Sequence, residues 1–369
     1  MLVLGLNLQV LFAQPAGTAG GAAAASPAAS VALPAPRWVA APRITGRLRA
    51  ADVGLVVNSE DGYSVAVGAY YARRRGLDPA QVLHVALPLR GTLSAEEFAD
   101  LRERIEAHFG AGTQALVLAW AQPYAVDCNS ITGALALGFD AALCRNGCAA
   151  PARTSPYFNS RSARPWADHL MRPSMLLAAR NVAEAQALID RGVAADGLLA
   201  RRGAPTAHAL MLTTHDAARG VRSLLYPPAG PLGGLPGAGS IDVEVVPAAA
   251  MAQARDVLIV QTGSAQVDLA MPPRWLPGAL ADHLTSFGGR LADPRHQSTV
   301  LDWLGSGATA SHGTVSEPCN HLQKFPHPQV LLLHYTQGAS AIEAYWKSVA
   351  WPQQSLFVGE PLAAPFARY

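Results

Sequence analysis

One stretch near the carboxyl terminus gathers several residue types that can do chemistry. Residues 307–320 read GATASHGTVSEPCN and include His312, Glu317, Cys319 and Asn320. Small residues let two backbones approach closely, and polar groups just past a strand lie where α/β folds build their sites. A thiol becomes a nucleophile only when a base lies beside it. The stretch therefore predicts a site at the end of a strand.

A second segment, residues 282–289 (DHLTSFGG), supplies a candidate base. A carboxylate stands next to an imidazole here, and two hydroxyls and a Gly-Gly pair follow. One hypothesis takes Cys319 as nucleophile and His283 as its base, with the amides of Gly288 and Gly289 stabilising an oxyanion. The alternative makes the acidic and imidazole groups structural residues at a helix end.

The four cysteines also permit two disulfides, which is the competing hypothesis for Cys319. Three pairings are possible; Cys144 and Cys148 are close enough in sequence to close a small loop, which leaves Cys128 and Cys319 as partners or as free thiols. An even number of cysteines suits an oxidising compartment. A zinc site would need a second close pair, so we expect no metal.

The predicted substrate-binding residues come from three segments that carry amides, hydroxyls or a carboxylate at expected strand or helix ends. They are Asn129, Ser130, Thr132, Ser286, Gly288, Gly289, Glu317 and Asn320. The chain has no phosphate-binding glycine loop, no dinucleotide fingerprint and no nucleophile elbow, so we expect no cofactor.

A third hypothesis is a glycan-acting hydrolase. It would use Glu317 together with Asp282 or Glu360. Such enzymes need two carboxyl groups about 5 to 9 Å apart.

Composition restricts the partners and the compartment. The chain has 369 residues, 15% of them charged, and a net charge of +2, which gives no electrostatic signal for nucleic acid. Residues 1–25 begin with an apolar run of signal-peptide length, too short to span a bilayer. We therefore expect a periplasmic or secreted protein with no stable membrane span, and a peptide or an envelope protein as its partner.

Strands and helices are predicted to alternate along the first part of the α/β domain. Strands are predicted over 52–58, 81–89 and 115–120, with helices over 63–75 and 94–109 between them, which is typical of a parallel sheet. The predicted domains are a disordered linker over 26–50 and one α/β domain over 51–369, or two packed halves over 51–205 and 206–369.

The alternation of strands and helices stops after the third predicted strand. Residues 121–205 are predicted to be an irregular insertion that serves as a lid or binding surface. Alternation then resumes, with helices predicted over 277–285 and 338–350 and strands over 308–315 and 356–362. The fold class is therefore α/β, with a mostly parallel sheet flanked by helices.

The motifs resemble an uncharacterised bacterial family of exported proteins. The resemblance covers roughly residues 50–366. It is carried by Val56–Asn58, Ser64–Gly76, Asp127–Thr132, Pro156–Asn159, Asp282–Gly289, Gly307–Cys319 and Gly359–Leu362.

The carboxyl-terminal half is remotely similar to gingipain-like cysteine peptidases of the caspase-like fold. In that family one strand ends in a catalytic His and the next in a catalytic Cys. Ser264 stands here where the family has His, and residues 285–289 contain no Cys. The resemblance implies a peptidase-like scaffold, and a relocated dyad of His283 and Cys319 if the protein is active. The alternative is a noncatalytic module with structural disulfides that binds a peptide or an envelope partner.

Overall fold

The computed structural model describes residues 37–232, 240–293 and 295–368, and Pro36–Tyr369 form one compact unit. The signal-like segment and the first part of the predicted linker lie outside the described residues. The rest of that linker, residues 37–50, is not a free chain. Leu48 is buried and its amide donates to Glu343, while the Val39 amide donates to Gln329. The apolar Leu48 joins the core, which anchors this segment.

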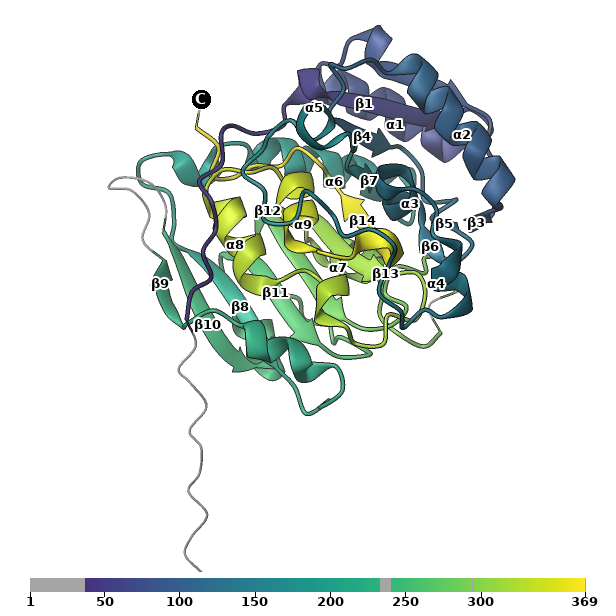
Figure 1. Cartoon of the computed structure of the whole chain (residues 1–369). Coiled ribbons are helices and arrows are strands. Elements are labelled where there is room, and N and C mark those ends of the chain that lie inside the picture. The colour runs from purple at the N-terminus through teal and green to yellow at the C-terminus, as the bar shows by residue number, and fades with distance from the viewer. Residues whose placement is uncertain (1–36, 233–239, 294, 369) are drawn as a thin grey trace, which may run out of the picture. The chain divides into compact units, whose positions relative to one another are not determined.

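An eleven-stranded, mostly parallel sheet forms the centre of the fold, as the sequence predicts (Figure 1). Its spatial order is β2-β1-β4-β7-β14-β13-β12-β11-β8-β10-β9. The strands are β1 (Val53–Asn58), β2 (Val82–Val85), β4 (Ala115–Leu118), β7 (Ser174–Leu176), β8 (Ala207–Thr213), β9 (Gly230–Leu232), β10 (Ile241–Pro247), β11 (Val257–Gly263), β12 (Trp275–Leu284), β13 (Ala310–Thr314) and β14 (Ser355–Gly359). A small second sheet contains β3 (Thr92–Leu93), β5 (Ala125–Val126) and β6 (Asn129–Ser130).

The strand direction reverses in the middle of the sheet. β13 and β14 pair antiparallel, with His312 opposite Phe357. On one side β14, β7, β4, β1 and β2 are parallel to one another, and on the other side β13, β12, β11, β8 and β10 are parallel. The carboxyl ends of the two halves therefore face opposite edges of the sheet. A loop that follows a strand of one half therefore starts at the opposite edge of the sheet from a loop that follows a strand of the other half.

Helices cover both faces. They are α1 (Gly62–Arg75), α2 (Ala95–His108), α3 (Ile131–Leu137), α4 (Ala141–Arg145), α5 (Pro165–His169), α6 (Val182–Ala195), α7 (Val300–Ser306), α8 (Pro328–Thr336) and α9 (Ala341–Ser348). Along β1, Leu55 and Val57 belong to the core cluster that contains α1, α8 and α9, whereas Val56 belongs to the cluster that contains α2. This alternation is the expected period of two for a strand buried on both faces.

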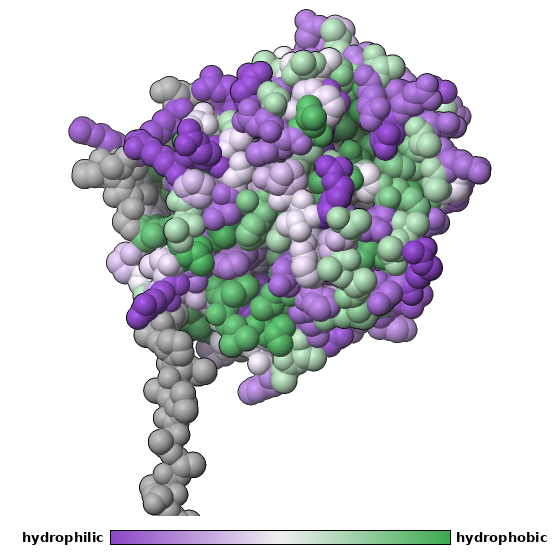
Figure 2. All heavy atoms as spheres, viewed as in Figure 1, coloured by the Kyte–Doolittle hydropathy of each residue, from purple (hydrophilic) through white to green (hydrophobic). Residues whose placement is uncertain are grey.

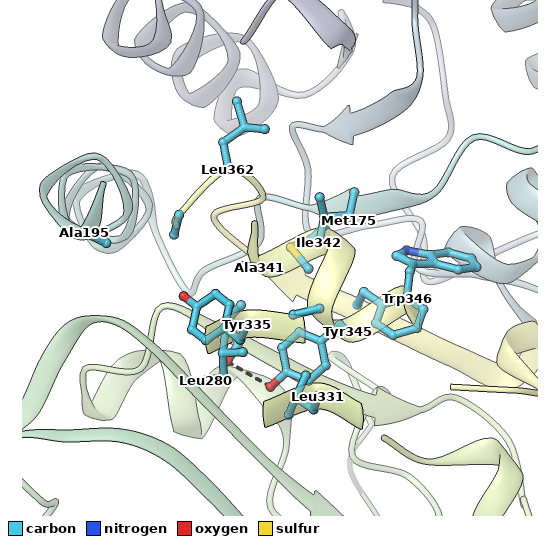
Figure 3. Packing of buried hydrophobic residues seen from close by; sticks show 14 of the residues in the cluster. Met175, Ala195, Leu280, Leu331, Tyr335, Ala341, Ile342, Tyr345, Trp346 and Leu362 are labelled. Carbon is cyan, nitrogen blue, oxygen red and sulfur yellow. Dashed lines mark hydrogen bonds between the residues drawn. The ribbon is translucent and has the colours of Figure 1, made fainter. Parts of the chain in front are cut away.

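Helices α8 and α9 pack across the junction of the two halves. Tyr335, Tyr345 and Trp346 lie among Leu280 and Met175 in a continuous apolar cluster (Figure 3). Their polar ends reach the backbone: the Tyr335 hydroxyl donates to Gly278 at 2.6 Å, and the Trp346 indole donates to Ser174 at 2.9 Å. Because β12 and β7 belong to different halves, these two bonds fix the halves together.

Two sequence predictions about the elements are wrong. Residues 277–285 were predicted to be helical, but they form most of β12, a central strand buried on both faces. Within the insertion predicted over 121–205, the helix expected over 182–195 is present as α6, but β7 was not expected, and it joins the main sheet between β4 and β14. Among the described residues no helix has the length and apolar character needed to cross a membrane.

Candidate functional site

The predicted site residues gather where β13 ends and β14 begins. Two segments meet here, and we call them the braced loops: residues 127–148, which include β6, α3 and α4, and residues 316–321. The Ser316 hydroxyl donates to the Cys128 carbonyl at 2.6 Å, which joins the two loops. They lie at the carboxyl edge of the β13 half. These two segments, which are distant in the sequence, are therefore in direct contact.

The disulfide pairing differs from the predicted one. Cys128 is bonded to Cys144, and Cys148 is bonded to Cys319, with Cα atoms 5.1 and 5.2 Å apart. The predicted pairs Cys144–Cys148 and Cys128–Cys319 do not form, because α4 places Cys144 beside Cys128 and directs Cys148 toward the loop after β13. The sequence permits three pairings and gives no reason to prefer this one.

Cys319 therefore carries no thiol. Its sulfur is bonded to Cys148, and a disulfide sulfur is neither a thiolate nor a nucleophile. The prediction of Cys319 as a catalytic nucleophile does not hold in this oxidised structure.

His283 is fully buried and uses both of its ring nitrogens. The Trp303 indole donates to Nδ1 at 2.9 Å, and Nε2 lies 3.0 Å from the Ser298 carbonyl, to which it donates. This pattern needs the neutral ring with the proton on Nε2. Burial lowers the pKa of His283 to about 4. His283 is thus a structural group and has no free nitrogen to act as a base.

The buried neutral His283 predicts an acid-sensitive fold. Its pKa is lowered by burial from 6.5 to about 4, so below pH 6.5 the unfolded chain binds a proton that the folded chain does not. His283 alone should lower the free energy of unfolding by about 3 kcal/mol as the pH drops from 6.5 to 4. Urea unfolding at both pH values measures this fall. In His283→Asn, which cannot titrate, the fall should shrink by about that amount; an unchanged pH dependence would refute the assignment.

The carboxylate next to His283 is also sequestered. Asp282 is completely buried and forms an ion pair with Arg222 of the 3-10 helix η4 (Gly220–Leu225), and it accepts from Gln261 at 3.0 Å. Burial raises the pKa of Asp282, and the neighbouring Arg222 opposes that rise. Arg222 is equally sequestered, because only 1% of its side chain is exposed.

A row of buried polar side chains extends across this part of the sheet. Gln261 lies beside Asp282 in the β11–β12 register, and continuing the β12–β13 register places His312 beside Asp282. His312 packs against the rings of Phe325, Tyr345 and Phe357, and neither of its nitrogens has a partner among the described residues. Burial keeps its pKa well below the usual value. Sequence analysis overlooked Arg222 and Gln261; the polar Gln261 within an otherwise apolar strand was the available signal.

Asn129, Ser130 and Thr132 are fully buried and serve the fold. Ser130 caps α3 by accepting from the Gly133 amide at 2.8 Å. The Ser130 and Thr132 hydroxyls both donate to the Ser355 carbonyl, at 2.6 and 2.7 Å. Asn129 holds the loop closed, since its amide donates to the Asp140 carbonyl at 3.0 Å. In this closed structure none of the three is accessible to a substrate.

Ser286, Gly288 and Gly289 lie against β13 and face no open space. A Cβ on Gly313 would come within 2.3 to 2.4 Å of the Gly288–Gly289 backbone, so close contact between β13 and the loop after β12 requires a glycine there. The Gly289 amide donates to the Thr314 carbonyl at 3.0 Å. That amide is therefore not free to bind an oxyanion.

Glu317 and Asn320 are the accessible members of the predicted set. Glu317 is exposed and accepts from the Cys319 amide at 2.8 Å, and the Asn320 side chain donates to the Ala218 carbonyl at 2.8 Å. The glycan hydrolase hypothesis needs a second carboxylate beside Glu317. Asp282 is buried against Arg222, and Glu360 is buried in an ion pair with Arg75, so neither is available.

The motif at residues 156–159 also has a structural role. Tyr157 is buried beneath Lys347, whose ammonium lies 4.9 Å from the ring centre and donates to the Ser162 carbonyl at 2.7 Å. Asn159 lies 2.9 Å from Nε2 of His334. These contacts hold the segment against α8 and α9, which is why Glu343 and Lys347 of α9 are buried.

The structure brings the braced loops together, but Cys319 and His283, the candidate nucleophile and base, are both bonded to other residues. Within the described ranges no three His, Cys, Asp or Glu side chains are placed to hold a metal ion. One cavity lies at the ends of α1 and α6, away from the braced loops, and a second is lined by residues 137–141 of the braced loops together with Ala152, Arg153 and Gln353. Compared with protein-family models, with curated proteins and with solved structures, the chain matches none of them.

Proposed function

We propose that this protein is an exported α/β module that binds a peptide or an envelope protein and does not cleave it. The observation that carries the proposal is the bond between Cys319 and Cys148, which removes the only nucleophile that the sequence offered at this edge. The full occupation of His283 by Trp303 and Ser298 supports it. Disulfides persist in oxidising compartments, which is consistent with export.

The braced loops are the surface that we assign to the partner. Two disulfides and the bond from Ser316 to Cys128 hold these loops, so they are presented in one arrangement, and a rigid loop loses little entropy on binding. Asp127, Asn146 and Glu317 are exposed on them. Elsewhere the large exposed apolar side chains are separated along the chain, and the face in Figure 2 mixes polar and apolar residues. A polar, loop-based contact therefore fits better than a broad apolar one.

Two measurements test this proposal. A thiol-directed activity probe should fail to label the purified oxidised protein, because no cysteine is free. A photo-crosslinking amino acid at position 317 or 146 should capture a partner in the envelope of a bacterium that exports the protein. The matched control is position 103 on α2, which is equally exposed but lies outside the braced loops.

The outcomes are distinct. Probe labelling that is lost in Cys319→Ala would favour the peptidase hypothesis over the binding module. Crosslinks that form equally from position 103 would show that the braced loops are not the binding surface.

A further inference from the structure

The first described part of the chain, residues 37–45, lies beside α8 without forming a helix or a strand (Figure 1). We call this segment the strap. None of its residues is buried. The chain then passes through Gly46, whose φ of 120° suits glycine, to Leu48, which is completely buried. The strap is therefore tied to the core at one end and buries no residue of its own.

Gln329 of α8 holds the start of the strap. Its Oε1 atom accepts from the Val39 amide at 2.6 Å, and its Nε2 atom donates to the Leu225 carbonyl at 3.3 Å. Because Gln329 is only 5% exposed, the bond to Leu225 fixes which end of the side-chain amide faces the strap. Gln329 thus presents an oriented acceptor to a main-chain N–H group.

Two further side-chain amides hold the strap by its main chain. Nδ2 of Asn159 donates to the Ala40 carbonyl at 3.0 Å, while its Oδ1 atom accepts from Nε2 of the buried His334 at 2.9 Å. At the end of α8, Oε1 of Gln337 accepts from the Ile44 amide at 2.9 Å. We call the three side chains the strap site: Asn159, Gln329 and Gln337.

The strap site recognises main-chain groups. N–H and C=O groups occur in every peptide, so the three amides can bind another extended segment with the same spacing. Pro42 lies between the held N–H groups of Val39 and Ile44 and has no N–H group that needs a partner. It also favours an extended conformation in the residue before it. A proline-containing segment therefore loses little entropy when it docks.

The strap is expected to open before the sheet does. Its bonds to Asn159 and Gln337 lie at exposed positions, and segments with few buried contacts open locally at low cost. Opening removes the donor from the buried Oε1 atom of Gln329. A buried acceptor without a partner is unfavourable, so an open site favours the return of the strap or the entry of another segment.

We propose that the strap occupies, within its own chain, a binding site for an extended, proline-containing segment of another protein, and that such a segment displaces it. The strap then limits the affinity for the partner, because the partner must compete with a segment that is tethered beside the site. The inference goes beyond the proposed function, since the strap site shares no residue with the braced loops.

Peptide titration of the full chain tests the inference. The probe is a fluorescein-labelled peptide with the sequence of residues 37–46, and fluorescence anisotropy follows its binding. In the double variant Val39→Pro with Ile44→Pro, the strap lacks the two N–H groups that Gln329 and Gln337 accept. We expect the probe to bind this variant about tenfold more tightly than it binds the wild type.

Two controls accompany the titration. Adding Gln337→Ala to the double variant should weaken binding about fivefold, whereas Gln323→Ala, an equally exposed glutamine outside the strap site, should leave it unchanged. A probe that carries the same two prolines should not bind. The inference is overturned if the original probe does not bind the double variant, if both probes bind it equally, or if the two glutamine variants have equal effects.

Hydrogen exchange of the wild-type full chain measures displacement directly. The amides of Val39 and Ile44 should exchange at least about tenfold faster than those of β1, and faster still with excess probe. Protection equal to that of β1 would show that the strap opens only when the whole fold does, which overturns displacement. Neither result affects crosslinking from the braced loops, so this inference and the proposed function fail independently.

Discussion

Replacing Asp282 with Ala is expected to lower the free energy of unfolding by about 3 to 5 kcal/mol. Its partner Arg222 is 1% exposed, so the substitution leaves a guanidinium group buried without a counter-charge. It also removes the acceptor of the Gln261 amide. Urea denaturation followed by tryptophan fluorescence at pH 7.5 measures the loss, provided that the urea dependence of the free energy is unchanged.

The control is an exposed ion pair of the same type. The side chains of Arg274 and Asp256 are 62% and 36% exposed, and Arg274→Ala should cost less than about 1 kcal/mol. The double variant Arg222→Met with Asp282→Leu, which leaves no buried charge, should recover most of the stability. Equal losses in Asp282→Ala and Arg274→Ala would contradict the burial of this pair.

Removing the second disulfide should have the largest effect of any loop change. Cys148 and Cys319 are 171 residues apart, whereas Cys128 and Cys144 are 16 apart. A cross-link that closes a longer loop restricts the unfolded chain more, so replacing both cysteines of each pair by Ala should cost about 5 and about 3 kcal/mol respectively. The bond to Cys319 also holds the two braced loops together, and its loss should reduce crosslinking from position 317.

Thermal unfolding of the two double variants, each beside the reduced wild type, provides the measurement. The Cys148/Cys319 variant should unfold at the lower temperature. If the Cys128/Cys144 variant were the less stable one, or if neither differed from the oxidised wild type, the bracing role would be wrong.

The elements with local signals could be predicted from the sequence. The helix predicted over 94–109 has such a signal: Ser94 and Glu97 form a capping box, and α2 begins at Ala95. Gly76 ends α1 with a φ of 65°, a conformation that glycine adopts without strain. Both signals lie within a few residues of the element that they define.

Other elements depend on contacts that the sequence does not display. β12 was taken for a helix because short apolar runs have no distinguishing period when both faces are buried. α8 was missed for a related reason: most of its residues are buried, so no polar stripe marks it. The reversal at β13 and β14 arises from the return of the chain to the middle of the sheet, which no local pattern encodes.

The candidate site was only partly predictable for the same reason. The spacing showed that polar residues cluster after β13. It did not show which of them form hydrogen bonds, ion pairs or disulfides within the fold. The sequence presents His283 as a free imidazole, but in the structure its two nitrogens form hydrogen bonds with Trp303 and Ser298. Cys319 appeared to be a candidate thiol until Cys148 was placed beside it.

The most direct test is a peptide mass map of the purified protein, prepared without reductant and with free thiols blocked. We expect two cross-linked peptide pairs, Cys128 with Cys144 and Cys148 with Cys319, and no blocked cysteine. A map in which Cys319 carries the blocking group would contradict this pairing, and would return this residue to the role of a nucleophile.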